Sequence, residues 1–343
     1  MGKLLIGCYS YTSCNKYGTN HEDVLALLRS AVKIVDNWRT THLPALEKGN
    51  AFQAIFVSPE YQFTDPMAPN VRMAMDEKTK QEVLKGLADI SDTYPKILMF
   101  PGTVFWKEPL NTPENLKKFQ AQLVAAELSK KGVGTGRTLL PSELKSKPSK
   151  MVDMGDSFRG KQVPSLKDLS GMVKHASTGY RVYNELYPFL AGKRLYPYRK
   201  QWDYKETEGA SATEKAYVPG CSAGTKEIGR FEFGFEICFD HNQGGLKAKG
   251  KEVDFHVVVS DCVATTEANM MMKDGGYFIH ASSNPGSTCV WERPGGMKKP
   301  VDPPLPTKAD ELGYCLVDVE RRAGSQDGVI SMPKTPVKLL RVA

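Results

Sequence analysis

The sequence predicts an α/β fold, in which strands buried in a sheet alternate with amphipathic helices. Over the first hundred residues, short apolar runs alternate with longer segments whose apolar side chains recur at the spacing of a helix face. Farther along, Phe231–Phe239 and Val253–Ser260 are continuous apolar runs, as in strands covered on both faces. With 343 residues, 41% of them hydrophobic, the chain is long enough for a substantial core. We therefore expect βαβ units with helices outside a mostly buried sheet.

The expected elements follow in chain order. The expected strands are Lys3–Tyr9, Ala51–Val57, Ile97–Phe100, Arg181–Leu190, Phe231–Phe239, Val253–Ser260, Tyr277–Ala281 and Gly313–Val319. The expected helices are His21–Trp38, Asp76–Thr93, Pro113–Lys130 and the Met-rich Thr265–Lys273.

Residues 107–180 interrupt this alternation. The part from Lys131 to Ser165 is rich in Lys, Gly, Ser and Pro and has little periodicity. We expect one domain spanning residues 1–343, with residues 107–180 as a surface insertion.

Charge and cysteine usage narrow the class of protein. The net charge of +7 comes from lysine-rich stretches without the interleaved aromatic residues that stack nucleic-acid bases, so no nucleic-acid partner is expected. The excess of positive charge hints at an anionic substrate. Seven cysteines form no C-x-x-C pair and no even framework, which favours a reducing compartment. The apolar run at Leu4–Ile6 is too short for a signal peptide or a membrane span, so the expected location is cytoplasmic, without membrane partners.

A possible nucleophile lies where an apolar run ends. In the segment Phe233–Asn242, Cys238 follows buried strand residues and precedes a polar turn. A sheet holds such a thiol rigidly, while the turn offers backbone N–H donors. Taken alone, an unpaired cysteine is more often a small core residue.

Two further strand-like segments end on residues with useful chemistry. Glu60 closes Phe56–Glu60, and Lys200 closes Tyr196–Lys200. Each could be a solvated surface charge. Their occurrence together with Cys238, each at the end of its own segment, favours a shared site.

At this point the chain resembles the nitrilase superfamily of carbon–nitrogen hydrolases, which is marked by a Glu, Lys and Cys in that chain order. The resemblance is carried by Pro59–Glu60, Asn184, Tyr198–Lys200 and Gly234–Asp240, and downstream by Val253–Ser260, Gly276–Gly286 and Leu312–Val319. It implies a four-layer α-β-β-α sandwich, a homodimer or larger homo-oligomer, and no cofactor or metal. It also implies attack on a non-peptide carbon–nitrogen bond of a small molecule: most of all an amide, with nitrile and N-carbamoyl compounds as further options.

The chemistry of the three residues agrees with that implication. A free thiol is mostly protonated at neutral pH, so a base must take its proton during attack, and Glu60 is the expected base. Lys200 and the backbone N–H of Phe239 are expected to stabilise the oxyanion, at roughly 3 to 4 kcal/mol for each well-placed donor. The superfamily also has a second glutamate between the lysine and the cysteine. We favour Glu214 for it, with Glu206 and Glu208 as alternatives.

The turn after the cysteine departs from the family pattern. Where the family commonly has Arg, an aromatic residue, Pro and Glu, this chain reads His241–Gly245. Phe239, Asp240, His241 and Asn284 are the expected substrate-binding residues. Asp240 also suits an orienting role in the turn, and Glu236 suits either the pocket or a salt bridge.

Other functions remain open. A Cys/His protease would need His241 as base, but a base three residues away on the same turn is rarely well placed. A metal site built from Cys221, Cys238, His241 and Cys262 lacks zinc-like spacing. The same Glu–Lys–Cys set also suits an acyltransferase that passes the acyl group to an amine. A catalytically inactive nitrilase-like binding protein is the remaining alternative.

Overall fold

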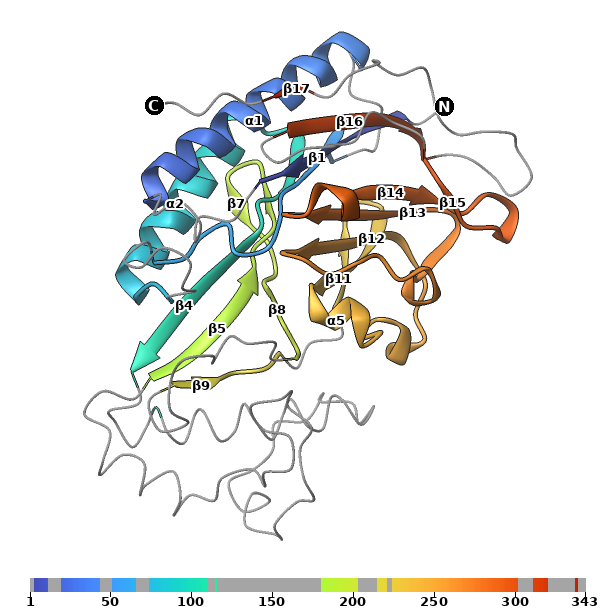
Figure 1. Cartoon of the computed structure of the whole chain (residues 1–343). Helices are drawn as coiled ribbons and strands as arrows, with labels where there is room; N and C mark the ends of the chain where they lie inside the picture. The colour runs from blue at the N-terminus through green and yellow to red at the C-terminus, as the bar shows by residue number, and fades with distance from the viewer. Residues whose placement is uncertain are drawn as a thin grey trace, which may run out of the picture.

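Two β-sheets pack face to face in this structure, and two long helices cover the outer face of the first (Figure 1). The computed structural model describes residues 3–11, 20–43, 51–65, 74–109, 115, 180–202, 215–220, 224–301, 311–319 and 337–338.

The first sheet is built around three parallel strands near the start of the chain. Its strand order is β17 (Val337–Lys338), β16 (Glu311–Asp318), β1 (Lys3–Ser10), β2 (Ala54–Val57), β3 (Ile97–Phe100), β6 (Phe189–Leu190) and β7 (Lys193–Arg194). Strands β1, β2 and β3 run parallel, whereas β16 joins the other side of β1 antiparallel. The expected strands Lys3–Tyr9, Ile97–Phe100 and Gly313–Val319 are confirmed to within two residues, and β2 begins later than expected, at Ala54. The single strand expected over Arg181–Leu190 is wrong, because the chain is divided there between β5 (Tyr180–Leu186) of another sheet and β6 of this one.

Helices α1 (His21–His42) and α2 (Glu77–Thr93) are the crossovers between these parallel strands. Each begins at a side-chain cap: Asn20 Oδ1 accepts from the Asp23 N–H and Asp76 Oδ1 accepts from the Thr79 N–H, both at 2.8 Å. Helix α1 continues a turn beyond the expected end at Trp38. Among the described residues, no helix is both long enough and apolar enough to cross a membrane.

The second sheet carries the cysteine strand. Its order is β10 (Thr225–Ile228), β11 (Phe231–Ile237), β12 (Val253–Ser260), β13 (Met272–Ser282), β14 (Cys289–Glu292) and β15 (Lys299–Pro300). Strands β11, β12 and β13 are parallel, so their carboxyl ends share one edge. The expected strand Phe231–Phe239 ends earlier, at Ile237, because the chain turns at Cys238.

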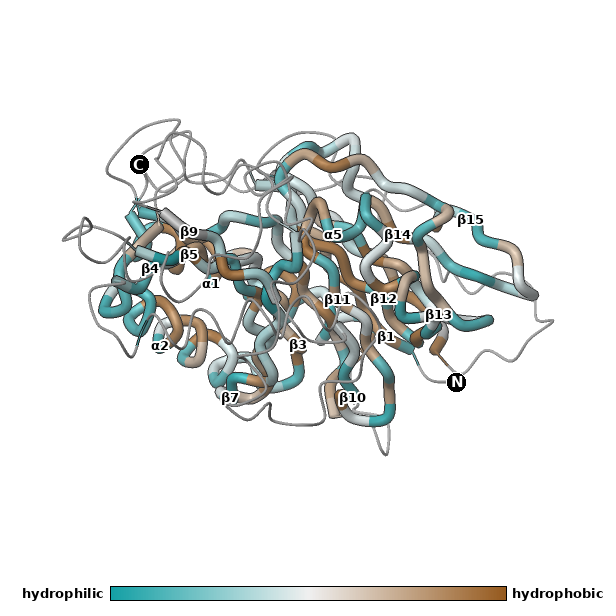
Figure 2. Tube along the Cα trace, turned by 90° about the horizontal axis from the view of Figure 1, so that it is seen from below, coloured by the Kyte–Doolittle hydropathy of each residue, from teal (hydrophilic) through white to brown (hydrophobic). Residues whose placement is uncertain are grey.

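One hydrophobic core lies between the two sheets. Side chains alternate along each strand, so one face of β1, β2 and β3 meets one face of β11, β12 and β13. Phe233, Phe235 and Ile237 of β11 point into this core. Figure 2 shows hydrophobic residues gathered along these inner strands. A second core fills the space between α1, α2 and the other face of the first sheet.

A smaller third sheet extends from the end of the first. It contains β4 (Thr103–Pro109), β5 (Tyr180–Leu186) and β8 (Tyr198–Arg199), and β9 (Lys215–Tyr217) pairs with β5. The antiparallel register joins Pro109 to Tyr180. Residues 107–109 and 180, which were expected in the insertion, are therefore strand residues. The rest of that segment and the expected helix Pro113–Lys130 lie, apart from Asn115, outside the described residues.

Among the described residues, short elements cover the outer face of the second sheet. These are α5 (Phe239–Asn242) and the 3₁₀ turns η3 (Lys247–Lys249) and η4 (Glu267–Asn269), while η5 (Pro285–Ser287) and η6 (Pro294–Gly296) lie at strand ends. The predicted helix Thr265–Lys273 is wrong, because Met272 already pairs with Val253 as the start of β13. Met270 and Met272 pack on Val258 and Phe278 of the sheet. The α/β class is confirmed. In the described part of the chain, helix, sheet and sheet are the regular layers of the expected α-β-β-α sandwich, and short elements stand in the place of its fourth layer.

Candidate active site

Glu60, Lys200 and Cys238 meet in one buried site, as the sequence predicts. Glu60 follows β2, Lys200 follows β8 and Cys238 follows β11, so each comes from a different sheet. The Glu60 and Lys200 side chains are fully buried, and Cys238 is 2% exposed. A buried glutamate and a buried lysine persist only when they are paired, and here they pair with each other.

The Glu60 carboxylate is the hub of the site. Its Oε1 accepts hydrogen bonds from Lys200 Nζ at 2.9 Å and from Asn184 Nδ2 at 2.8 Å. Its Oε2 accepts from the Asp261 N–H at 3.2 Å. These donors favour the charged carboxylate and fix its orientation.

The backbone fixes the same residues. The Glu60 N–H donates to the Ser260 carbonyl at 3.3 Å, and the Lys200 N–H donates to the Asn184 carbonyl at 3.0 Å. The Lys200 carbonyl in turn accepts from the Gly220 N–H and from the Tyr217 hydroxyl. Both ends of the Lys200–Glu60 ion pair are therefore held by neighbouring strands.

Cys238 lies at a sharp turn between β11 and α5. Its N–H still donates to the Val259 carbonyl at 2.8 Å, continuing the ladder with β12. Its buried thiol lies beside the Glu60 carboxylate and the side chain of Cys262, both of which raise its pKa beyond the effect of burial. The base and the nucleophile predicted from the sequence are thus neighbours.

The backbone is strained at two points of this site. Tyr61, next to Glu60, has φ of 54°, and Cys238 has φ of 48°. Side chains rarely adopt such values, and among the described residues only Ala191 is a further non-glycine example. Gly102 packs against the Glu60 turn, where an added Cβ would lie 2.1 Å from the Pro59 carbonyl oxygen. Strain of this kind concentrates at functional sites, where the surrounding structure holds it.

The Cys238 thiol stays protonated at neutral pH. Burial raises its pKa well above the ordinary value near 9, and the neighbouring Cys262 side chain and the charge of Glu60 raise it further, against the opposing effect of Lys200. Attack at neutral pH therefore needs a base to take the proton, and Glu60 is its neighbour.

This gives a prediction about pH. Alkylation of Cys238 by iodoacetamide, followed by mass spectrometry of its peptide, should keep rising above pH 9 without a plateau near neutrality. Because the folded thiol holds its proton to higher pH than the unfolded chain, this group should also lower the free energy of unfolding as pH rises above about 8.5. A plateau that begins below pH 7 would show a preformed thiolate instead.

Asp240 ties the cysteine turn to the lysine segment. Its buried carboxylate accepts from the Tyr198 hydroxyl at 2.8 Å and from the N–H groups of Gln201 and Trp202 at 3.0 Å. Burial raises the pKa of Asp240 to about 7, although these donors and Lys200 favour its charged form. The bonds fit the orienting role expected from the sequence and leave the carboxylate engaged by the protein.

The other expected substrate-binding residues differ in position. Phe239 begins α5 directly after the nucleophile. Asn284 is exposed at the carboxyl end of β13, where its N–H donates to the Asp261 carbonyl at 3.2 Å. The fully buried ring of His241 has both nitrogens occupied by protein partners, Glu236 and the Thr266 N–H. These contacts turn the ring away from the thiol and do not suit the Cys/His protease.

Some expectations fall outside the described residues. Glu206, Glu208 and Glu214, the candidates for a second glutamate, and Cys221 of the alternative metal site all lie there. Sequence reasoning also missed the contact of Cys262 with the nucleophile. Its position just beyond the end of β12, the parallel neighbour of β11, was the available signal.

The structure is similar to solved members of the nitrilase superfamily. No protein-family model and no curated protein matches the sequence. Nit3 of Saccharomyces cerevisiae, described as a member of branch 10 of that superfamily, is 14% identical, with 93% of this chain and 91% of that chain covered and a TM-score of 0.46. A nitrilase-superfamily amidase from Nesterenkonia AN1 is 12% identical, with 91% and 88% covered and a TM-score of 0.42. A glutamine-dependent NAD⁺ synthetase from Acinetobacter baumannii is 11% identical, with 95% of this chain and 49% of that chain covered and a TM-score of 0.45.

These likenesses concern the fold and are too distant to assign an activity.

Proposed function

We propose that this protein is a carbon–nitrogen hydrolase that cleaves a small non-peptide amide through a thioester on Cys238. One observation carries the proposal: the buried Glu60 carboxylate bonds to the Lys200 ammonium and lies beside the buried Cys238 thiol, whose pKa it raises. Together these residues supply a nucleophile, a base and a cation in one buried site.

In the first half of the reaction, the Cys238 sulfur attacks the carbonyl carbon while Glu60 takes the thiol proton. The C–S bond forms, and the carbonyl π electrons move onto oxygen. Lys200 and the Phe239 N–H stabilise that oxyanion. When the oxyanion collapses, the C–N bond breaks and the amine leaves with the proton that Glu60 held.

In the second half, Glu60 takes a proton from water, which attacks the thioester carbon. The C–S bond breaks, the sulfur recovers a proton, and the free acid leaves. If an amine excludes water at this step, the same residues give acyl transfer. Nitriles and N-carbamoyl compounds present a comparable electrophilic carbon.

The proposal is tested by trapping the thioester. Purified protein is mixed with a panel of simple amides, nitriles and N-carbamoyl amines, each in a neutral and a carboxylate-bearing form, and is quenched in acid. We expect at least one member to increase the intact mass by its acyl group, with the adduct on the Cys238 peptide and the amine or ammonia released.

The products then separate the two outcomes. Free acid without conjugate supports hydrolysis, whereas a conjugate formed when hydroxylamine or a primary amine is added, in place of the acid, supports transfer. If folded protein gives neither an adduct nor a product with any compound of the panel, the result would count against the proposed chemistry.

A further inference from the structure

Glu236 is a buried acid that the proposed reaction does not use. Along β11, Phe235 and Ile237 face the core between the sheets, so Glu236 points to the opposite, outer face. Its side chain is 1% exposed. A carboxylate buried to that extent is strongly destabilising unless donors compensate it.

Three donors compensate the Glu236 carboxylate. Oε2 lies 2.8 Å from His241 Nδ1 and 2.9 Å from His256 Nε2, and Oε1 accepts from the Leu246 N–H at 2.7 Å. His256 belongs to β12, whereas His241 and Leu246 belong to the segment that follows the nucleophile. One carboxylate therefore joins two strands of the sheet to both ends of that segment.

The backbone fixes the proton positions on both rings. The Thr266 N–H donates to His241 Nε2 and the Met271 N–H donates to His256 Nδ1, each at 3.1 Å. An amide N–H can only donate, so these two nitrogens carry no proton. The ring protons then lie on His241 Nδ1 and His256 Nε2, and both point at Glu236.

This proton arrangement also bears on metal binding. The three ligand atoms of Glu236, His241 and His256 lie within 4.8 Å of one another, as in a cation site. A cation there would displace both ring protons and leave each imidazole with none, because the remaining nitrogens face N–H donors. The geometry therefore suits a hydrogen-bonded cluster.

In this cluster the negative charge lies on the Glu236 carboxylate. Burial acts to raise the pKa of Glu236, but His256 and His241 outweigh it and bring that pKa to about 2. Burial also lowers the pKa of His256, so its ring is neutral at pH 7 and acts as a donor.

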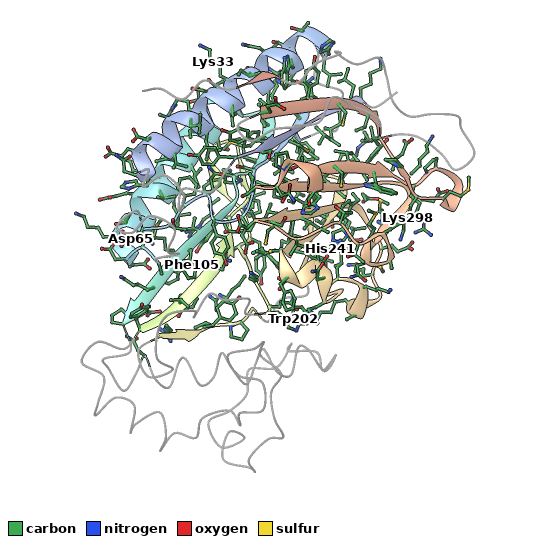
Figure 3. All side chains as sticks on the ribbon, viewed as in Figure 1. Lys33, Asp65, Phe105, Trp202, His241 and Lys298 are labelled. Carbon is green, nitrogen blue, oxygen red and sulfur yellow. The ribbon has the colours of Figure 1, made fainter. Side chains whose placement is uncertain are left out.

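The cluster is attached to the strained nucleophile turn. The His241 N–H donates to the Cys238 carbonyl at 3.0 Å, and Asn269 Nδ2 donates to the His241 carbonyl at 2.7 Å. Figure 3 labels His241 beside the second sheet, and Trp202 lower in the same view. Asp240 accepts from the Trp202 N–H and so anchors the turn to the segment that follows Lys200. A backbone with φ of 48° persists only when its surroundings hold it in this way.

We propose that Glu236, His241 and His256 are positioning residues that hold the Cys238 turn in its strained conformation, so that the thiol stays buried against Glu60. This inference rests on the proposed function only in naming Cys238 as the nucleophile. The histidine that replaces the family's usual arginine at position 241 thereby acquires a role in holding the turn.

The test is Glu236→Gln, with Glu232→Gln as the matched control. The amide introduced at 236 keeps the shape, but its NH₂ faces a donor in either orientation: the two ring N–H groups in one, and the Leu246 N–H in the other. Neither ring proton can move to the nitrogen that faces a backbone N–H. Glu232 lies on the same strand and face, paired with Lys251 and Lys273 and remote from the turn.

Two rates are measured on folded protein. The first is iodoacetamide alkylation of Cys238, by peptide mapping that separates it from exposed Cys262, and the second is acyl-adduct formation with an active panel member. For Glu236→Gln we expect alkylation about tenfold faster, because the thiol is released from burial, and acylation about 100-fold slower, because a displacement of about 1 Å costs that much. Glu232→Gln should match the wild type in both rates.

Faster alkylation together with slower acylation indicates a positioning role. If Glu236 only stabilised the fold, its replacement would lower the melting temperature and leave both rates of the folded protein unchanged. Unchanged rates in folded Glu236→Gln overturn the inference. If that variant does not fold, two variants of His256 replace it. His256→Gln retains a donor and should keep the wild-type alkylation rate, whereas His256→Leu should raise that rate. Equal alkylation rates in these two variants would overturn the inference. The alkylation result stands even if no panel member acylates the protein, so failure of the proposed function is recognised separately.

Discussion

Cys238→Ser should abolish acyl-adduct formation and turnover while the fold persists. The hydroxyl occupies the place of the sulfur, but it is far less acidic and less nucleophilic, and the site is arranged around a thiol. We expect turnover to fall by roughly 10⁴ to 10⁶, the range found when a nucleophile is removed from an interdependent set. Initial rates and intact mass with an active panel member measure the loss.

Cys289→Ser is the control for that change. Cys289 lies on β14 and its sulfur contacts Thr265 Oγ1 at 3.2 Å, away from the Glu60–Lys200 pair. It should keep the wild-type adduct on Cys238. Normal turnover in the Cys238→Ser protein would end the thioester hypothesis, and loss in both variants would point to a general effect of altering thiols.

Glu60→Gln should remove the base and destabilise the protein together. Without a carboxylate to take the thiol proton, acylation should slow by about 10² to 10⁴. The Lys200 ammonium would also lose its buried counterion, which costs about 3 to 5 kcal/mol when one partner of a buried pair is removed. Rapid-quench acylation and urea denaturation measure the two effects separately.

Glu185→Gln separates the catalytic effect from the loss of a buried charge. Glu185 is also a buried acid, but its carboxylate bonds to Arg199 and to the Trp106 indole. It should lower stability in the same direction and leave acylation of the folded fraction within a few-fold of wild type. Equal slowing in both variants would contradict a role for Glu60 as base.

The sequence was informative where local pattern and tertiary position agree. The strand ends at Glu60, Lys200 and Cys238 could be found because apolar runs stop abruptly and a family pattern flanks them. The parallel core strands were predicted for the same reason, since burial on both faces leaves a continuous apolar run. The convergence of the three side chains depends on how three different sheets pack together, which no local pattern in the sequence encodes.

The predictions that were wrong concern residues whose conformation is set by contacts with residues distant in the sequence. Met270–Met272 appears helical in isolation, but the pairing of Met272 with Val253 and the Met271 N–H bond to His256 make it extended. His241 appears to line a pocket from its place in the chain. Only the contact with Glu236, across the turn, shows that its ring points to the other face.

The hydrogen bonds of Glu60 have a consequence for folding. Its carboxylate is bonded to residues 124, 140 and 201 positions away, which belong to the third sheet and to the edge of the second. Contacts of such long range close large loops and form late. The reactive set therefore cannot exist in a partly folded chain. During refolding, the moment at which the Cys238 thiol becomes resistant to alkylation would mark the docking of the three sheets. The nucleophile itself therefore reports when the fold is complete.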